Sequence, residues 1–269
     1  MRSSAYLFAF TIYLILAIGL GQRIVLWPAI WLFPRRRRRL VRAWLRFHAR
    51  STLAMARGIA NVRISVRGAI PPESCIVVMN HQSVLDIPIG LRLVPGPYPL
   101  IPTRDRYEWG VPGISPLARL ARYPFVSQKR VLSRSELASL TDAAEQVASG
   151  EQSLLIFPEG HRSRDGGLGR FMRSGLRIIL SRAERPVYCV AVHGMVNART
   201  FADGLANFAN LDVRIAISDA IAPPAAGSDD GTIDAFIDLL RGRMAAMLAE
   251  LDTEPSTRSA SAADSFARR

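Results

Sequence analysis

Hydrophobic positions in the first 34 residues form two nearly continuous runs. The first, residues 5–21, is uncharged, and the second, residues 24–34, follows directly after Gln22 and Arg23. A helix rises about 1.5 Å per residue, so the first run is just long enough to cross a hydrocarbon core of about 30 Å. Two arrangements are open: a short spanning helix with an interfacial second segment, or a re-entrant hydrophobic hairpin in the cytoplasmic leaflet.

Short apolar runs alternate with helical stretches in the rest of the chain. Five runs predict strands, and the middle ones are apolar throughout, as in a buried sheet: residues 75–80, 124–127, 153–158, 186–194 and 212–218. Helical spacing predicts helices at residues 83–92, 116–121, 133–149, 174–183 and 232–251. The alternation predicts an α/β fold, a mainly parallel sheet flanked by helices and preceded by an N-terminal hydrophobic membrane segment.

These patterns divide the chain into four parts. We expect a membrane-inserted segment at residues 1–34, a basic membrane-surface linker or helix at 35–72, an α/β domain at 73–252 and a disordered tail at 253–269. The tail is rich in Ser, Ala and Arg, a composition that buries too little apolar surface to fold. Within the domain, Ser133 followed by Glu136 predicts a capping box at the start of a helix.

Positive charge is concentrated in the N-terminal part. The net charge is +13, and residues 1–72 hold 13 arginines and no acidic residue, so the rest of the chain is balanced. That balance argues against nucleic-acid binding, which spreads basic residues over the folded domain. Arginines after residue 34 outnumber Arg2, which predicts a protein of the cell inner membrane with its α/β domain on the cytoplasmic side. The arginine run 35–39 also disfavours a cleaved signal peptide.

Residues 35–50 mix arginines with apolar residues at near-helical spacing. The apolar residues are Leu40, Val41, Trp44, Leu45 and Phe47. This pattern is typical of a helix that lies on anionic headgroups. A solvated basic linker is the alternative interpretation.

The first candidate for chemistry is the stretch Asn80-His81-Gln82-Ser83-Val84-Leu85-Asp86, directly after a predicted buried strand. His81 stands at the carboxyl end of that strand, where α/β proteins bind ligands. Asp86 can orient the imidazole and leave its other nitrogen to take a proton from a hydroxyl. A helix start with an acidic residue in its first turn would give the same spacing without any chemistry.

The second candidate is the stretch Phe157-Pro158-Glu159-Gly160-His161-Arg162-Ser163, again after an apolar strand. A tight turn there would present Glu159 and Arg162, and an arginine can bind a phosphate through two parallel hydrogen bonds. A plain surface loop is the alternative. The glycine-rich residues 165–170 and the stretch Phe171-Met172-Arg173-Ser174-Gly175 follow.

Together these blocks resemble the glycerolipid acyltransferase family, the lysophosphatidic acid acyltransferases. The stretch at 80–86 matches that family's N-H-x4-D block, residues 157–163 its F-P-E-G-T-R-S block, and 171–175 its F-K-x-G block. The apolar block at 185–194 fits in order as well. His161 departs from the pattern because the family usually has threonine there.

The resemblance implies a set of roles for these residues. His81 would be the general base on an acceptor hydroxyl and Asp86 its orienting partner, with no acyl-enzyme intermediate. The expected acceptor-binding residues are Asn80, Gln82, Ser83, Glu159, Gly160 and Arg162. The family also uses a basic residue from a middle block, here 125–130, where Ser127-Gln128 lacks the usual charges. Either Lys129 or Arg130 takes that role, or the acceptor differs.

The resemblance further implies the partners and the reaction. We expect acyl transfer from acyl-CoA or acyl carrier protein, as co-substrate, to a lysolipid at a membrane with anionic lipids. The default acceptor is 1-acylglycerol-3-phosphate, and a lyso-aminolipid such as lyso-ornithine lipid is the runner-up. A non-catalytic lipid-binding membrane adaptor is the alternative of another class.

No cofactor or metal is expected. His81, Asp86, Glu159 and His193 are plausible metal ligand types, but they lack paired H-x-x-x-H spacing. Cys75 and Cys189 form no C-x-x-C pair, which argues against a disulfide framework. Cys189 lies in an apolar strand and is expected to be a small core residue.

Overall fold

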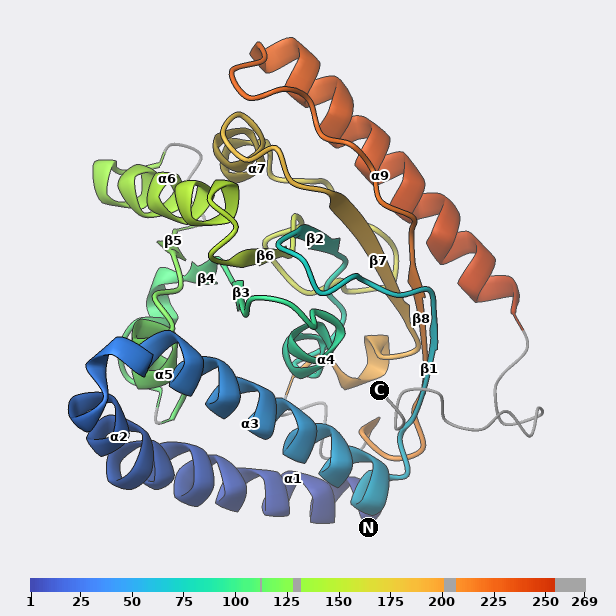
Figure 1. The fold of residues 1–269 in the computed structure, drawn as a ribbon. Helices are drawn as coiled ribbons and strands as arrows, with labels where there is room; N and C mark the ends of the chain where they lie inside the picture. Colours follow the sequence, from blue (N-terminus) through green and yellow to red (C-terminus); the bar gives the residue numbers. More distant parts are fainter. Residues whose placement is uncertain (112, 128–131, 201–206, 255–269) are drawn as a thin grey trace.

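A six-stranded sheet forms the centre of the protein in the computed structural model, which describes residues 1–111, 113–127, 132–200 and 207–254 (Figure 1). Its strand order is β1-β8-β7-β2-β6-β3. The strands are β1 (Arg63–Arg67), β2 (Ile76–Met79), β3 (Pro99–Leu100), β6 (Ser153–Ile156), β7 (Val187–His193) and β8 (Asp212–Ile217). All neighbours are parallel except β7 and β8, which confirms the predicted mainly parallel sheet.

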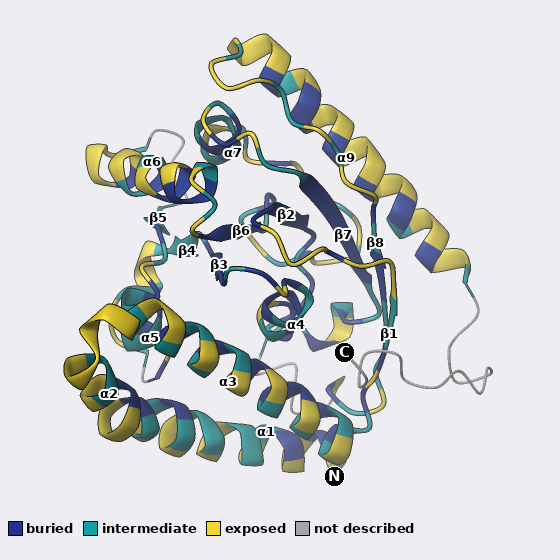
Figure 2. Ribbon diagram, in the orientation of Figure 1, coloured by how far each residue is buried: buried dark blue, intermediate teal, exposed yellow. Residues whose placement is uncertain are grey.

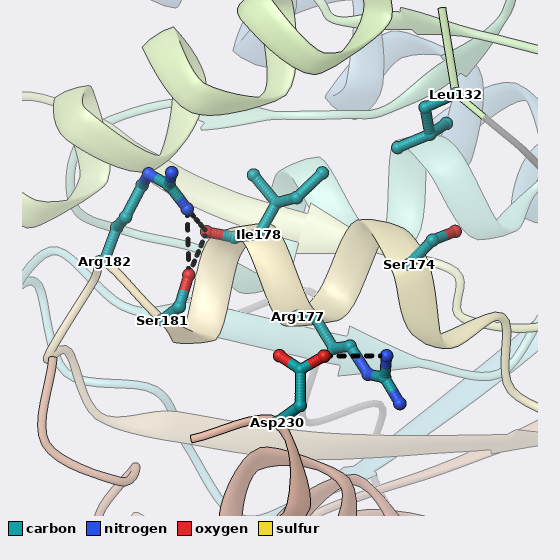
Figure 3. Close-up of a pocket in the computed structure, with 7 residues that line it drawn as sticks. All are labelled: Leu132, Ser174, Arg177, Ile178, Ser181, Arg182 and Asp230. Atoms are coloured by element: carbon teal, nitrogen blue, oxygen red, sulfur yellow. Dashed lines mark hydrogen bonds and ion pairs between the residues drawn. The ribbon is translucent and has the colours of Figure 1, made fainter. Parts of the chain in front are cut away.

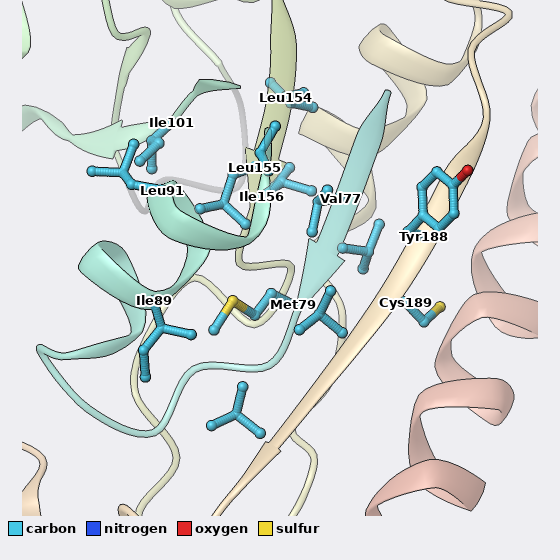
Figure 4. Packing of buried hydrophobic residues seen from close by; sticks show 14 of the residues in the cluster. Val77, Met79, Ile89, Leu91, Ile101, Leu154, Leu155, Ile156, Tyr188 and Cys189 are labelled. Carbon is cyan, nitrogen blue, oxygen red and sulfur yellow. The ribbon is translucent and has the colours of Figure 1, made fainter. Parts of the chain in front are cut away.

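The central strand β2 pairs with β6 on one side and with β7 on the other. All four residues of β2 and all four of β6 are buried, as expected for strands covered on both faces. Figure 4 shows this core, where Val77 of β2 lies beside Leu155 of β6, its partner in register. Because the paired strands are parallel, the loops that follow β2 and β6 leave the same edge of the sheet.

Helices cover both faces of the sheet (Figure 1). On one face α4 packs against the sheet, and α3 packs against α4. On the other face α9 packs against β7 and β8, with α7 and α6 beside it. The bounds are α3 (Arg37–Ala60), α4 (Asp86–Leu93), α5 (Ile114–Leu120), α6 (Arg134–Ala148), α7 (Arg173–Leu180) and α9 (Asp230–Thr253). The predicted capping box of Ser133 and Glu136 is confirmed at the start of α6.

The two N-terminal apolar runs form one continuous helix rather than two segments. It extends over Arg2–Leu32 through α1 (Arg2–Tyr13), the π-helical η1 (Leu14–Leu20) and η2 (Gln22–Leu26), and α2 (Trp27–Leu32), and it is long and apolar enough to cross a membrane. Gln22 causes no break because it is buried and its Nε2 donates to the Gly113 carbonyl (3.1 Å). The chain turns only at 33–36, through the short η3 (Pro34–Arg36), and α3 then packs back against α1.

The apolar stripe of α3 faces protein rather than lipid. Val41 and Leu45 are buried in the core together with Ala49 and Leu53 of the same helix. The expected contact of this stripe with headgroups is therefore wrong for Val41 and Leu45. Helical spacing indicates an apolar face, but it does not distinguish a protein surface from a bilayer that covers it.

Several arginines of the basic segment attach α3 to the rest of the protein. Arg46 Nη2 donates to the carbonyls of Val94 (3.1 Å), Pro95 and Gly96 (2.8 Å) after α4, and Arg37 Nη2 donates to Leu120 O (3.0 Å). These guanidinium groups satisfy carbonyls at helix ends, which otherwise lack partners. Part of the N-terminal positive charge thus has an internal structural role.

The sheet begins earlier than the sequence analysis expected. β1 lies inside the segment 35–72 that was assigned to the linker, and it pairs in parallel with β8 along Arg63–Arg67. The predicted strand at 124–127 is β5 (Phe125–Val126), which pairs with β4 (Thr103–Arg104) in a separate two-stranded sheet. Only Ile64 of β1 is buried, and an exposed arginine stands at each end of the strand, so it lacks the continuous apolar run that marks the inner strands.

Helix α4 approaches the sheet at Gly90. A Cβ added to Gly90 would lie 2.3 Å from Cδ2 of Leu155 on β6. We expect Gly90→Ala to destabilise the protein by about 1–3 kcal/mol, because overpacking forces the helix away from the sheet. Gly58→Ala on α3, where nothing lies within 4 Å of the added atom, is the matched control and should gain up to about 1 kcal/mol. Thermal unfolding of both variants checks this, and equal shifts would contradict the close approach.

Candidate functional site

The loop after β2 begins with a side chain that extends the sheet. Asn80 is buried, its Nδ2 donates to Val192 O (2.9 Å), and its Oδ1 accepts from Val192 N (2.7 Å) on β7. The amide side chain thus continues the β2–β7 ladder by one further pair. This fixes where the loop leaves the sheet, so Asn80 has a positioning role rather than an open binding face.

Asp86 is the first residue of α4, and its carboxylate is completely buried. One oxygen, Oδ2, accepts from Nδ1 of His81 (2.7 Å) and from the backbone N–H groups of Gln82 (2.6 Å) and Ser83 (2.7 Å). An ionised carboxylate only accepts, so the proton of the imidazole is on Nδ1 and Nε2 carries the free lone pair. The structure therefore brings together the two residues that were predicted as a base and its orienting partner.

The imidazole of His81 is also held by an aromatic ring. The rings of His81 and Phe157 stack with centroids 4.2 Å apart and an angle of 24° between their planes. The His81 side chain remains 15% exposed. Its orientation is thus set by Phe157 and Asp86 together, while part of the ring stays accessible to a ligand.

Gln82 and Ser83 connect this loop to a segment after β7. Ser83 Oγ donates to Ala198 O (2.6 Å), and Gln82 Oε1 accepts from Met195 N (3.1 Å). Both side chains are buried. The two residues were predicted to bind substrate, but these contacts make them supports of the loop that carries His81.

Glu159 joins the two candidate loops. Its side chain is buried; Oε1 accepts from the backbone N–H of His81 (3.1 Å) and Oε2 from that of Gly169 (2.8 Å). Burial raises the pKa of this carboxyl group, and the two N–H donors act in the opposite direction. Both oxygens are engaged, so Glu159 is a brace between loops rather than a group that faces an acceptor.

Two guanidinium groups lie around the turn at Gly160. Arg104, on β4, donates from Nε (3.2 Å) and Nη2 (2.9 Å) to Gly160 O, and Arg162 donates to Arg199 O. Burial, together with repulsion from Arg106 and Arg162, lowers the pKa of Arg104. The side of the site that carries Gly160 is therefore electropositive.

Gly160 itself has a conformation that favours glycine. Its φ is +67°, and a Cβ there would lie 2.5 Å from Sδ of Met172. The FMRSG block, which contains Met172, thus packs against the turn of the FPEG block.

Arg104 was missed by the sequence analysis. The basic residue of the middle block was sought at Lys129 and Arg130, which lie outside the described residues. Arg104 instead comes directly before the helical turn η4 (Asp105–Tyr107), on a two-residue strand too short to give a hydrophobic pattern. The only signal in the sequence was its position as an arginine between the stretches at 80–86 and 157–163. Several other arginines lie in the same interval, so this position did not single out Arg104.

A surface cleft of about 360 Å³ lies elsewhere, along α7 and the start of α9 (Figure 3). Its lining residues are Leu132, Ser174, Arg177, Ile178, Ser181, Arg182 and Asp230. Arg177 is paired with Asp230 (3.1 Å) and with Asp234 (2.5 Å), so its charge is neutralised. The cleft shares no lining residue with the surroundings of His81.

Comparison with known proteins gives a consistent picture. The family model described as Acyltransferase matches residues 61–193. Human 1-acyl-sn-glycerol-3-phosphate acyltransferase alpha is 25% identical over 202 residues, which cover 72% of this chain and 66% of that protein. The 1-acyl-sn-glycerol-3-phosphate acyltransferase of Pseudomonas aeruginosa is 27% identical over 166 residues, 59% of each chain. This chain thus spans less than two thirds of the length of either relative.

The fold has a solved counterpart. The crystal structure of the 1-acyl-sn-glycerophosphate (LPA) acyltransferase PlsC from Thermotoga maritima superimposes with a TM-score of 0.70 at 21% identity. The match covers 95% of this chain and all of that chain. It therefore shows that the N-terminal helices and the sheet share one fold with that protein.

The bridging geometry of Glu159 generates a test. In Glu159→Gln, one oxygen is replaced by an NH2 group, so either His81 N–H or Gly169 N–H loses its acceptor. We expect a loss of stability of about 1–3 kcal/mol, the usual cost of an unsatisfied buried polar group. Glu145→Gln, an exposed site on α6, is the matched control. Denaturant unfolding that shows the same stability for both variants would contradict the bridge.

Proposed function

Since this chain belongs to the acyltransferase family and is distantly related to the 1-acyl-sn-glycerol-3-phosphate acyltransferases, we propose that it is a membrane-bound O-acyltransferase. It moves a fatty acyl group from acyl-CoA or acyl carrier protein to the free hydroxyl of a lysophospholipid. The proposed acceptor is 1-acylglycerol-3-phosphate, which becomes phosphatidic acid. The observation that carries this proposal is the His81–Asp86 hydrogen bond beside two arginines.

The chemistry follows from the state of the imidazole. Nδ1 donates to Asp86, so Nε2 of His81 accepts the proton of the acceptor hydroxyl as its oxygen attacks the thioester carbonyl carbon. The C–S bond then breaks, and the departing thiolate takes the proton back from Nε2. The buried charge of Asp86 stabilises the imidazolium between these steps. No acyl group is attached to the protein in this sequence.

The guanidinium groups of Arg104 and Arg162 provide positive charge for the phosphate of the acceptor. We assign Arg104 and Arg162 to the phosphate, since an arginine fork matches a phosphate in geometry and charge. One edge of the Arg104 guanidinium, Nε and Nη2, donates to Gly160 O. This contact holds the Arg104 side chain at the turn of the FPEG block. Binding of an anion relieves the mutual repulsion of these arginines.

The N-terminal helix supports a location on one membrane face. Ser3 Oγ accepts from Ala209 N (2.9 Å) near its start, and Gln22 contacts Gly113 near its far end. A helix attached to the domain at both places cannot cross the bilayer while the domain stays in water. We therefore propose that it lies in the cytoplasmic leaflet, with the exposed apolar face visible in Figure 2 toward the lipid.

Activity of site variants tests the proposed base. His81→Ala should lower the rate of labelled acyl transfer by about 10²–10⁴-fold, the usual contribution of a general base. Asp86→Asn keeps an oxygen for the backbone donors but loses the charge, so it should lose activity with little loss of fold. His193→Gln, whose ring lies between Arg214 and Asp252, is the control. Full activity of either site variant would show that the pair is not the base.

The acceptor is tested by comparing lysolipids. Purified protein should acylate lysophosphatidate, and Arg104→Gln should raise the KM for it by about tenfold or more, since a charge-assisted contact contributes about 1.5–3 kcal/mol. Preference for lyso-ornithine lipid would assign the protein to lyso-aminolipids instead. Lipid binding without transfer to any acceptor would favour the adaptor interpretation.

A further inference from the structure

Exposed aromatic and cationic side chains lie between the candidate site and the N-terminal helix. They belong to η4, the loop after it and α5: Arg106 and Trp109 are exposed, and Tyr107 and Arg119 are half-buried beside them. Trp109 is 67% exposed, which is unusual because tryptophan is highly buried on average. No catalytic step above uses any of these residues.

The segment that carries Trp109 connects the site to the helix. At its start, Arg104 bonds to Gly160 O beside the FPEG turn. At its end, Gly113 accepts a hydrogen bond from Gln22, and a Cβ added to it would lie 3.3 Å from Cγ2 of Ile18. The residues between these two anchors therefore span from the electropositive side of the site to the N-terminal helix.

Exposed apolar side chains lie in both chain segments that meet at this junction. Ile15 and Leu16 lie exposed on η1, next to the residues that Gly113 touches, and Ile114 is exposed on the other side of the contact. Trp109 adds a large exposed apolar side chain in the segment between this junction and Arg104. A patch of this kind on a folded protein marks an interaction surface.

The polar atoms around the patch have the chemistry of a membrane interface. The guanidinium of Arg119 lies 3.9 Å from the Trp109 ring centroid, and that of Arg106 lies 4.7 Å from the ring centroid of Tyr107. Tryptophan and tyrosine rings and arginine side chains are common at the headgroup level of a membrane, because each has an apolar part that can contact lipid and a polar part that can contact water. Asp105 and Glu108 partly balance the arginines, so the aromatic rings rather than net charge dominate the contact.

We propose that Trp109, with Tyr107, Arg106 and Arg119 around it, is a second membrane contact that seats in the headgroup layer of the bilayer. The contact rests on the membrane association in the proposed function and adds to it. With the helix on one side and Trp109 on the other, the entrance of the site at Gly160 faces the lipid surface. The lysolipid headgroup can then reach Arg104 without leaving the interface completely.

Fluorescence quenching tests the contact. Trp109 is kept as the single tryptophan by replacing Trp27, Trp31 and Trp44 with Phe, and the protein is bound to phosphatidylcholine–phosphatidylglycerol vesicles that contain brominated acyl chains. We expect bromine to quench Trp109 and vesicles to protect it from aqueous iodide. The control variant carries L239W, at an exposed position of α9, as its single tryptophan. Bromine should not quench the fluorescence of this tryptophan.

Several outcomes overturn the proposal. The proposal is wrong if bromine quenches Trp109 no more than the control, or if the protein does not bind the vesicles. It is also wrong if Trp109 is protected from iodide without lipid, since a second copy or another region of the protein would then cover it. Quenching needs no catalysis, so a protein that transfers no acyl group but shows a lipid-seated Trp109 overturns only the activity.

A second variant avoids dependence on the tryptophan replacements. Trp109→Ser in the otherwise native chain should lower the vesicle partition coefficient several-fold relative to Leu239→Ser. Its rate on detergent-dispersed acceptor should match the native protein. Equal partitioning of the two serine variants would contradict the contact.

Discussion

A buried carboxylate oxygen, Oδ2 of Asp86, accepts three N–H groups and thereby sets the geometry of the site. These three donors replace water at Oδ2, while Oδ1 is buried without a hydrogen-bond partner among the described residues. Two of those donors are backbone groups of the loop that also carries His81, so the same interaction shapes the loop and selects the imidazole tautomer. Glu159 repeats the arrangement at the next loop by accepting from the backbone of His81 and Gly169. Two acidic side chains thus hold the candidate loops in place through backbone N–H groups.

The sheet makes these contacts possible. β2 and β6 are adjacent and parallel, so the loops after Met79 and Ile156 meet at one edge, as ligand sites in such sheets do. The N-terminal arginines serve a related purpose on the other side of the molecule. Arg37 and Arg46 hold α3 against the ends of α5 and α4, and α3 in turn packs against α1 of the N-terminal helix. The N-terminal helix is therefore attached to the domain that carries the candidate site rather than being a separate tether.

The inner strands and the His81–Asp86 pair were predictable from the sequence, because continuous apolar runs and polar residues at strand ends are local patterns. The edge strand β1 was not, since only one of its residues is buried, arginines stand at both its ends, and its pairing with β8 is non-local. The roles of Asn80, Gln82 and Ser83 also depended on distant partners: Val192, Met195 and Ala198. Helical spacing in α3 predicted an apolar face correctly but could not identify what covers it. Arg104 was missed because only the fold brings β4 to Gly160.

In the proposed reaction, His81 removes a proton from an acceptor hydroxyl during direct attack on the thioester. A comparison of lysophosphatidate with an analogue that carries a thiol in place of the free hydroxyl tests this role of His81. A thiol ionises near pH 8.5 and needs little help from a base at that pH. We expect His81→Ala to lose far less activity with the thiol acceptor than with the hydroxyl acceptor. An equal loss with both acceptors would contradict a general-base role for His81.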